Sequence, residues 1–291
     1  MTEERFYAFA GLEFSVEVTD SDRFWQNEGV LSEFRVDTVR DPHRFRFHRQ
    51  RELPPPSGEK VANIPGFLIY QRGNAVLRYS GASDGAWENA CVMEEHREKE
   101  HTVVLKASQY EQGIGAKTVL KSMMVEHLIA QNRGFVFHCS YVACGNRAIL
   151  FTAPSETGKS TQAELWKKLR AAEIINGDRA AVRPEDGKLM AEGIPFAGSS
   201  TYCKNRSLPI AAIVYLGQAP KTSIRRISGF EAFAKIWEGI SVCTWDREDM
   251  ELVSRTAQIA AEQIPVYHMP CTPDESAVIA LEQELRKLVN N

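Results

Sequence analysis

The sequence predicts a protein of the α/β class (α+β overall), with a β-rich N-terminal module followed by alternating strands and helices. Three observations support this: apolar and polar residues alternate in short segments of the first third, strand and helix patterns alternate after Phe135, and residues 209–217 form a nearly continuous apolar run. Alternation with a period of two is typical of strands with one buried face. A continuous apolar run is typical of a strand that is buried on both faces.

The composition is that of an ordinary globular protein, with 291 residues, 43% hydrophobic content, 25% charged content and a net charge of -3. This length suits one large or two medium domains. The mildly acidic balance argues against nucleic-acid and anionic-membrane partners, which require basic surfaces. The N-terminus has neither the pattern of a signal peptide nor that of a membrane span. Because the six cysteines form no CxxC pair, we expect reduced thiols in a cytoplasmic protein.

The β-rich module is assigned to residues 1–113. Its strands are expected to be antiparallel, with Gly73-Asn74 as a hairpin turn and a Pro-rich loop at 52–60. The expected strands lie at 13–18, 43–48, 66–80 and 101–108. Around Gly113 the period changes, and apolar residues recur at helical spacing until Gly134. This change sets the predicted boundary, so that residues 114–291 form the second domain.

The second domain opens with two strands, 135–143 and 147–152, that are joined at Gly145-Asn146. A further strand within 171–183 leads into a hairpin whose turn is Asp186-Gly187. The segments 228–231 and 272–275 have the form of capping boxes and are expected to open the last helices, the second with Pro273 at the first helical position.

The stretch "APSETGKST" (153–161) lies between an apolar strand and an amphipathic helix, as a phosphate-binding loop requires. Gly158 lets the backbone approach a phosphate closely, Lys159 can reach the β- and γ-phosphate oxygens, and the Ser160 hydroxyl can bind Mg²⁺. Ala153 replaces the first glycine of the usual pattern, which is tolerable where φ is negative. Glu156 would repel a phosphate unless its side chain points outward.

Four further residues are candidates for the same site. Asp178 follows an apolar strand in "EIINGDR", where we expect a carboxylate that binds the metal or orients a nucleophile; the alternative is that it only starts a turn after Gly177. His138 lies in a strand upstream of the loop, a position more typical of a core histidine. Lys204 and Arg206 precede the buried strand and either face a phosphate or are solvated loop charges. The only metal expected is Mg²⁺ or Mn²⁺.

The chain resembles HPr-kinase-like proteins in the order of four segments: "FHCSYVACGNRAILF", "APSETGKST", "INGDRAAVR" and "GIPFAGSSTYCKNRSLPIAAIVYLGQ". These proteins share a core with the HPr kinase/phosphorylases and, more distantly, with the phosphoenolpyruvate carboxykinases. The resemblance covers roughly Gly134 to the C-terminus and implies a P-loop kinase core that uses ATP and Mg²⁺. By this resemblance, His138 corresponds to the strand histidine of the family. Gly177-Asp178 corresponds to the family's pair of aspartates, of which this chain keeps only the second. The residues that the resemblance assigns to the phosphate-binding loop are Ser155, Glu156, Thr157, Gly158, Lys159, Ser160 and Thr161.

These residues predict an ATP-dependent kinase that phosphorylates a hydroxyl, such as a serine or threonine of a peptide or small protein. Ser160 and Asp178 would hold the metal, and Asp178, His138 and Lys159 would be catalytic, with Arg206 as a further phosphate contact. Lasso-peptide kinases resemble this family, which makes a ribosomal peptide a plausible acceptor and the N-terminal module a recruiting element. A homo-oligomer is possible by the same resemblance. The alternatives are a non-catalytic nucleotide sensor or scaffold and a carboxykinase-type enzyme.

Overall fold

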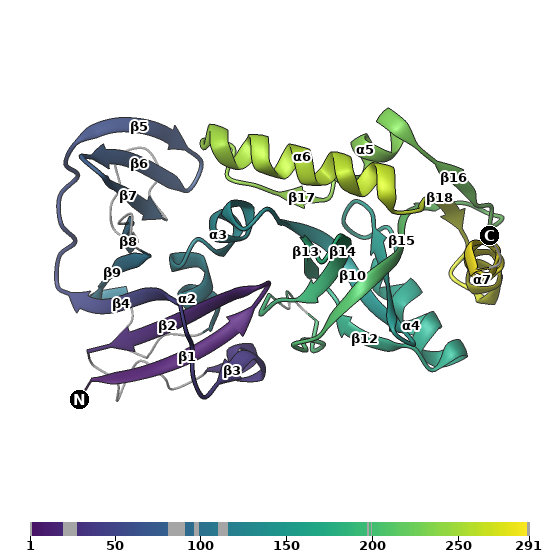
Figure 1. The fold of residues 1–291 in the computed structure, drawn as a ribbon, viewed down its shortest axis with the longest axis horizontal. Helices are drawn as coiled ribbons and strands as arrows, with labels where there is room; N and C mark the ends of the chain where they lie inside the picture. Colours follow the sequence, from purple (N-terminus) through teal and green to yellow (C-terminus); the bar gives the residue numbers. More distant parts are fainter. Residues whose placement is uncertain are drawn as a thin grey trace. The chain divides into compact units, whose positions relative to one another are not determined.

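The computed structural model describes residues 2–19, 28–80, 91–95, 99–109, 116–196, 198 and 200–289. Its contacts divide the chain into two compact units, residues 1–125 and 126–291. The boundary predicted from the sequence, at Gly113, lies outside the described residues and stays a prediction. Strands and helices are mixed throughout, which confirms the predicted α/β class (Figure 1). Within the described residues, no helix is both long enough and apolar enough to cross a membrane.

In unit 1 the described strands form one sheet in the order β3-β1-β2-β4-β9-β8-β7-β6-β5. Their bounds are β1 Glu3–Phe9, β2 Leu12–Val18, β3 Arg35–Val36, β4 His43–Gln50, β5 Glu59–Ile64, β6 Phe67–Arg72, β7 Ala75–Ser80, β8 Cys91–Glu95 and β9 Glu100–Lys106. Two 3₁₀ turns, Gly29–Phe34 and Ala107–Gln109, and the helix α2 (Ala116–Ser122) complete the described elements of the unit. Buried aromatic residues such as Phe14, Phe45 and Phe47 form the interior of this unit.

The predicted strands of unit 1 are present, but the expectation that all are antiparallel is wrong. Strand β4 pairs in parallel with both β2 and β9. The reason is that β5 to β8 are inserted as a meander between β4 and β9, so β9 returns beside β4 in the same direction. Strand β5 begins inside the predicted Pro-rich loop. Its side chains are mostly exposed, and an exposed edge strand lacks the apolar alternation that identifies a strand in a sequence.

The helix predicted around residues 119–128 is two helices, α2 and α3 (Val125–Gln131). Met124 adopts a left-handed backbone conformation with φ of 50° and interrupts the helical pattern between them. The apolar spacing continues across this break, so periodicity alone could not reveal it.

In unit 2 the sheet pairs in the order β11-β10-β13-β14-β15-β18-β16, and β11 also pairs with β15, so the first five strands close on themselves. The bounds are β10 Phe135–Cys144, β11 Arg147–Thr152, β12 Glu173–Asn176, β13 Arg179–Glu185, β14 Lys188–Gly193, β15 Ser207–Gln218, β16 Arg225–Ile227, β17 Ile240–Ser241 and β18 Val266–Cys271. The strands β11, β15 and β18 run parallel to one another. Their carboxyl ends therefore share one edge of the sheet, where the loop after β11 begins.

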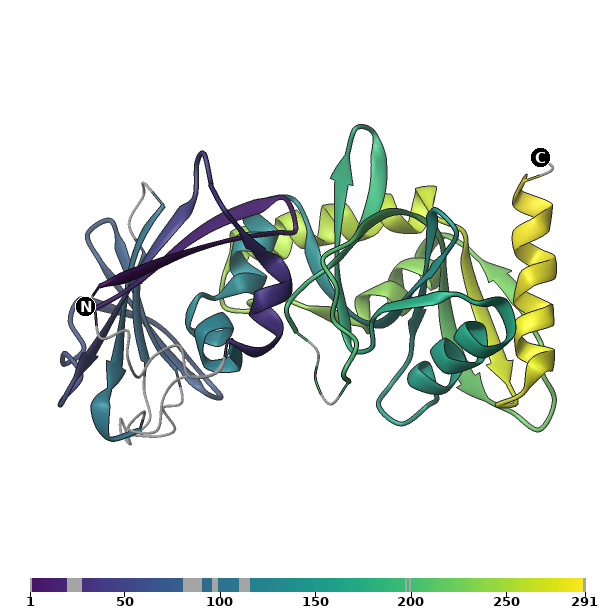
Figure 2. The same cartoon turned by 90° about the horizontal axis from the view of Figure 1, so that it is seen from below.

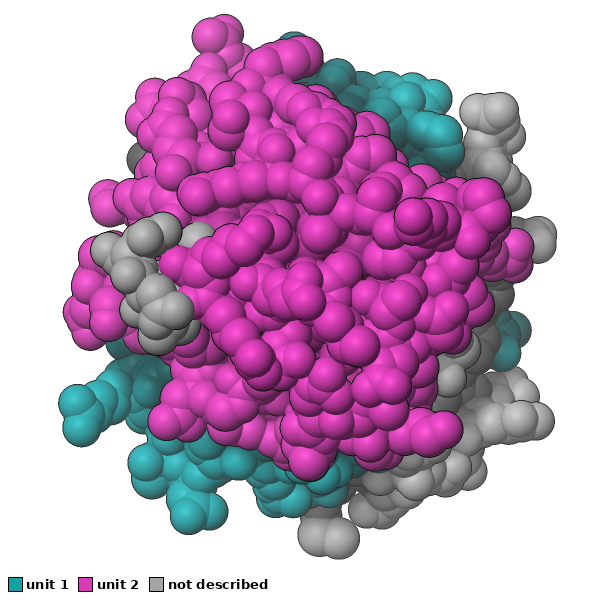
Figure 3. Space-filling view, turned by 90° about the vertical axis from the view of Figure 1, so that its right-hand side faces the viewer, with its two compact units in different colours: residues 1–125 teal, residues 126–291 magenta. Residues whose placement is uncertain are grey.

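Helices cover both faces of these strands, as Figure 2 shows from a second direction. They are α4 (Lys159–Arg170), α5 (Gly229–Trp237), α6 (Arg247–Gln263) and α7 (Glu275–Val289). Neighbouring residues of a strand point to opposite faces, so Leu150 joins a core with α5 and α6, whereas Ile149 and Phe151 join another with α4 and α7. Figure 3 shows the surface of unit 2 in magenta.

Two helix starts differ from the predicted capping boxes. Helix α7 begins at Glu275, so Pro273 is not its first helical residue, and Asp274 Oδ1 accepts from Ser276 N (2.9 Å). At α5, Ser228 is the N-cap but makes no side-chain capping bond, and the Glu231 side chain pairs with Arg225. A capping-box pattern locates a helix end to within a turn and does not determine which polar group caps it.

Candidate active site

The loop between β11 and α4 has the geometry of a phosphate-binding loop. Gly158 is the N-cap of α4 with φ of 117°, and a Cβ placed there would meet no atom within 4 Å. The first N–H groups of a helix have no partner within it and carry the positive end of its dipole. The start of α4 is therefore open to an anion, with Lys159 and Ser160 in its first turn.

Ala153, in place of the usual first glycine, is not among the residues with positive φ, so the loop tolerates alanine as predicted. The left-handed residue of this loop is Glu156, with φ of 63°. Its side chain is exposed and lines the cleft described below. Its carbonyl accepts from Gln218 Nε2 (3.3 Å), which ties the loop to the end of β15.

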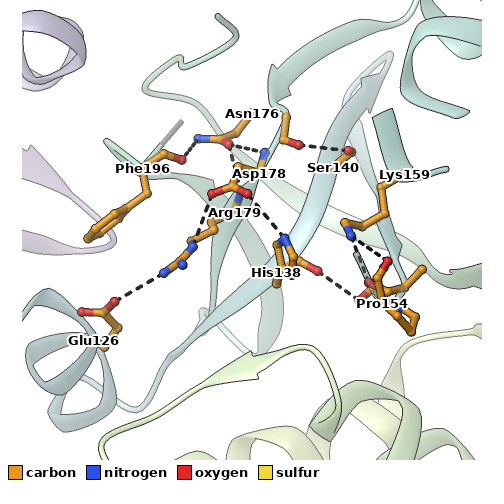
Figure 4. Close-up of polar contacts among 12 residues, drawn as sticks. Glu126, His138, Ser140, Pro154, Lys159, Asn176, Asp178, Arg179 and Phe196 are labelled. Carbon is orange, nitrogen blue, oxygen red and sulfur yellow. Dashed lines mark hydrogen bonds and ion pairs between the residues drawn. The ribbon is translucent and has the colours of Figure 1, made fainter. Parts of the chain in front are cut away.

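Lys159 is buried and its ammonium group lies against the loop itself. Nζ donates to the carbonyls of Ala153 (2.9 Å) and Pro154 (3.3 Å), as Figure 4 shows. Burial lowers the pKa of Lys159, and the nearby Cys139 and Asp178 oppose that shift. The two carbonyls hold the Lys159 ammonium group within the loop.

Asp178 lies at the turn after β12 and faces His138 from β10. Its Oδ1 is 3.4 Å from His138 Nε2, and its Oδ2 is 3.4 Å from Arg179 Nε (Figure 4). The contact with His138 is the largest cause that lowers the pKa of Asp178, burial opposes it, and the charges of Arg179 and Lys159 lower it further. These contacts favour the ionised carboxylate over its protonated form, and the ionised form is the one that a metal ligand or a proton acceptor requires.

Asn176 fixes the turn that carries Asp178, and the sequence analysis did not single it out. This fully buried residue accepts through Oδ1 from the amides of Asp178 (2.9 Å) and Arg179 (3.0 Å). Its Nδ2 donates to the carbonyls of Ile194 (2.9 Å) and Phe196 (3.0 Å). The signal was present in "NGD", because Asn side chains commonly bond to the backbone two residues on.

Lys159, Asp178 and His138 line one cleft of 610 Å³. The predicted residues that line it are His138, Ser155, Glu156, Lys159, Ser160 and Asp178. Thr157, Gly158 and Thr161 belong to the same loop and first turn but are not among the lining residues. Lining residues that the sequence analysis did not single out are Glu164, Ile174, Ser200, Thr201 and Tyr202.

Arg206 does not reach this cleft. Its guanidinium pairs with Glu173 and approaches the carbonyl of Gly145 (3.5 Å). Glu173 is the first residue of β12, whereas Asp178 comes after the last residue of that strand. Gly145 lies in the turn that follows β10, and His138 lies toward the other end of β10. Arg206 therefore lies at the opposite edge of the sheet, and the structure does not bring this predicted phosphate contact to the cleft.

A second polar cluster lies outside the cleft, where His127, Asp246 and Asp249 place potential ligand atoms within 4.8 Å of one another. Asp249 Oδ2 is 2.8 Å from His127 Nδ1, and its Oδ1 accepts from Gln131 Nε2 (2.8 Å). Asp246 caps α6, and the positive end of that helix disfavours a cation there. The cluster joins α3 to α6 as a hydrogen-bonded network.

The chain matches no protein-family model and no curated protein. Among solved structures it is similar to the Hpr(Ser) kinase/phosphatase from Coxiella burnetii, with a TM-score of 0.33 and 10% sequence identity. That similarity covers 53% of this chain and 93% of the other. A likeness of this size carries no argument about function, which has to be inferred from the cleft itself.

Proposed function

We propose that the chain is an ATP-dependent kinase that transfers the γ-phosphate to a hydroxyl of a peptide or small protein. The observation that carries the proposal is that Lys159, at the start of α4, lines the same cleft as Asp178 and its partner His138. Phosphoryl transfer depends mainly on positioning and charge neutralisation. A helix start with a lysine, beside an ionised carboxylate, supplies both.

The residues present fit a triphosphate with Mg²⁺. The open start of α4 suits the phosphate oxygens, and the exposed Ser160 together with Asp178 offers the oxygen ligands that Mg²⁺ prefers. The metal, when bound, neutralises charge on the phosphates. Lys159 would turn from its carbonyl partners to the phosphate, and Asp178 would hold the metal or accept the proton of the acceptor hydroxyl, with His138 orienting the carboxylate.

The two alternatives fit the cleft less well. A carboxykinase-type reaction on a dicarboxylic acid needs several cations, but the described lining residues include Lys159 and His138 as the basic groups and three acids. A nucleotide sensor without turnover is favoured by Glu156, whose carboxylate lies beside the expected phosphates. The pairing of Asp178 with His138 favours catalysis, because a sensor has no need of a proton acceptor.

The test uses the full chain with Mg·ATP and a library of serine- and threonine-containing peptides. Lys159→Ala should lose nucleotide binding and transfer, whereas Asp178→Asn should bind nucleotide and lose transfer. Arg206→Ala is the matched control, since its charge lies at the opposite edge of the sheet. Nucleotide binding by the native chain with no transfer to any acceptor would support the sensor, and retained transfer by Lys159→Ala would refute the proposal.

A further inference from the structure

Ser200 packs directly on the turn that carries Asp178. A Cβ added at Gly177 would lie 2.2 Å from Ser200 Oγ, so only glycine leaves room for this side chain. A Cβ added at Gly198 would lie 2.7 Å from Asp178 Cγ. Ser200 also lines the cleft that contains Lys159. A hydroxyl of the chain itself thus lies at the proposed site of transfer.

The Ser200 hydroxyl is available as a nucleophile. Its Oγ accepts a hydrogen bond from the backbone N–H of Tyr202 (3.1 Å), which orients the side chain and leaves the hydroxyl proton to be donated. The residue is half-buried at the cleft wall. The neighbouring Thr201 is exposed, and its secondary hydroxyl is more hindered than the primary hydroxyl of serine.

We propose that Ser200 is an acceptor in its own active site, so that the chain phosphorylates itself there. The inference rests on the proposed kinase function. The Ser200 Oγ–P bond forms as the bond from the γ-phosphorus to the bridging oxygen of ATP breaks, ADP leaves, and the hydroxyl proton passes to the Asp178 carboxylate. Because Ser200 faces the cleft of its own chain, the transfer occurs within one molecule.

The product would change the cleft. A phosphoserine carries a charge of about −1.5 to −2 at neutral pH, and at Ser200 this charge would lie beside Asp178 and near the position of the next γ-phosphate. Like charges at this distance repel. Phosphorylation of Ser200 should therefore reduce transfer to any other acceptor.

The experiment begins with full-length chain that has been treated with a phosphatase and then freed of it. The chain is incubated with Mg·ATP, nucleotide consumption is recorded, and the phosphate is located by fragmentation mass spectrometry. We expect one phosphoryl group at Ser200, its loss in Ser200→Ala and Lys159→Ala, and its return in Ser200→Thr. The initial rate per chain should not depend on protein concentration.

The possible failures are distinguishable. Nucleotide binding and consumption with Ser200 unmodified would overturn this inference and leave the kinase proposal standing. No nucleotide binding at all would overturn both. In a mixture of native chain with ¹⁵N-labelled Lys159→Ala chain, phosphate on Ser200 of the labelled chain would show transfer between molecules and overturn the intramolecular assignment.

Discussion

His138 Nε2 lies 3.4 Å from Asp178 Oδ1, and this contact connects the first long strand of unit 2 to the turn after β12. Both ends of the contact are held by backbone bonds of β10: His138 N donates to Gly239 O (2.7 Å), and Cys139 N donates to Asp178 O (3.0 Å). The geometry of the pair is therefore set by the sheet. Substitutions of the His138 or Asp178 side chain should therefore alter the contact between the two side chains and leave the backbone in place.

The contact predicts a shift in the pH dependence of transfer. His138→Gln removes the largest cause that lowers the pKa of Asp178, so that pKa should rise toward its ordinary value. Because the ionised carboxylate is the active form, the acid limb of the kcat/KM profile should move to higher pH. An acid limb at the same pH in both proteins would contradict the role given to His138.

Asp178 should also contribute to the pH dependence of folding. Its pKa is lower in the folded chain than its ordinary value, so its stabilising contribution is complete above the unfolded pKa and is lost as the pH falls through the folded pKa. Asp178→Asn removes this contribution. Urea unfolding across an acidic pH series should show a shallower loss of stability in the variant, and parallel curves would exclude the effect.

Glu156 combines a strained backbone with a charge beside the expected phosphates, and two substitutions separate these effects. Glu156→Gly relieves the left-handed conformation and should raise the free energy of unfolding by about 1 kcal/mol. Glu156→Gln keeps the strain and removes the charge. Both should tighten Mg·ATP binding by roughly fivefold, in keeping with one like-charge contact. Calorimetric titration checks the affinity, and an unchanged affinity in both variants would show that the side chain points away.

Gly198 tests whether the position of Asp178 controls transfer. In Gly198→Ala the new Cβ would lie 2.7 Å from Asp178 Cγ and displace the carboxylate, so transfer should fall roughly 100-fold while nucleotide binding persists. Gly187→Ala is the matched control, because φ is also positive there and no atom lies within 4 Å of the added Cβ. Equal losses of transfer in the two variants would assign the effect to backbone strain.

Asn176 should be needed for both stability and transfer. Asn176→Ala removes four buried or partly buried hydrogen bonds to backbone groups and should cost about 3 kcal/mol of unfolding free energy. In the folded fraction, kcat should fall more than KM rises, because the turn beneath Asp178 loosens. Asn146→Ala, in the exposed turn after β10, should leave both quantities unchanged. Denaturant titration and steady-state rates give the two measurements.

Local patterns in the sequence were enough to predict the strand–turn–helix around Gly158 and most strands, because the preference for a strand, a glycine turn or a helix start is expressed within a few residues. They also predicted that Lys159 and Asp178 share one site, since each residue follows a strand and the ends of the two strands lie at the same edge of the sheet. The same reasoning failed for Arg206, because whether a side chain reaches that edge depends on the register of β15 beside β14, which no local pattern encodes. Asn176 was missed for a similar reason, since two of its four partners come from residues 194 and 196.

The two carbonyls that hold the Lys159 ammonium group would affect both the association rate and the affinity of the proposed nucleotide. If the proposed triphosphate binds here, it has to compete with two carbonyls for the Lys159 ammonium group, so only the fraction of molecules in which Lys159 has left these carbonyls would capture it. The observed dissociation constant is then weaker than the intrinsic one by that fraction. Weaker hydrogen bonds from Lys159 to these two carbonyls would raise the association rate and lower the observed dissociation constant, with no new contact to the nucleotide.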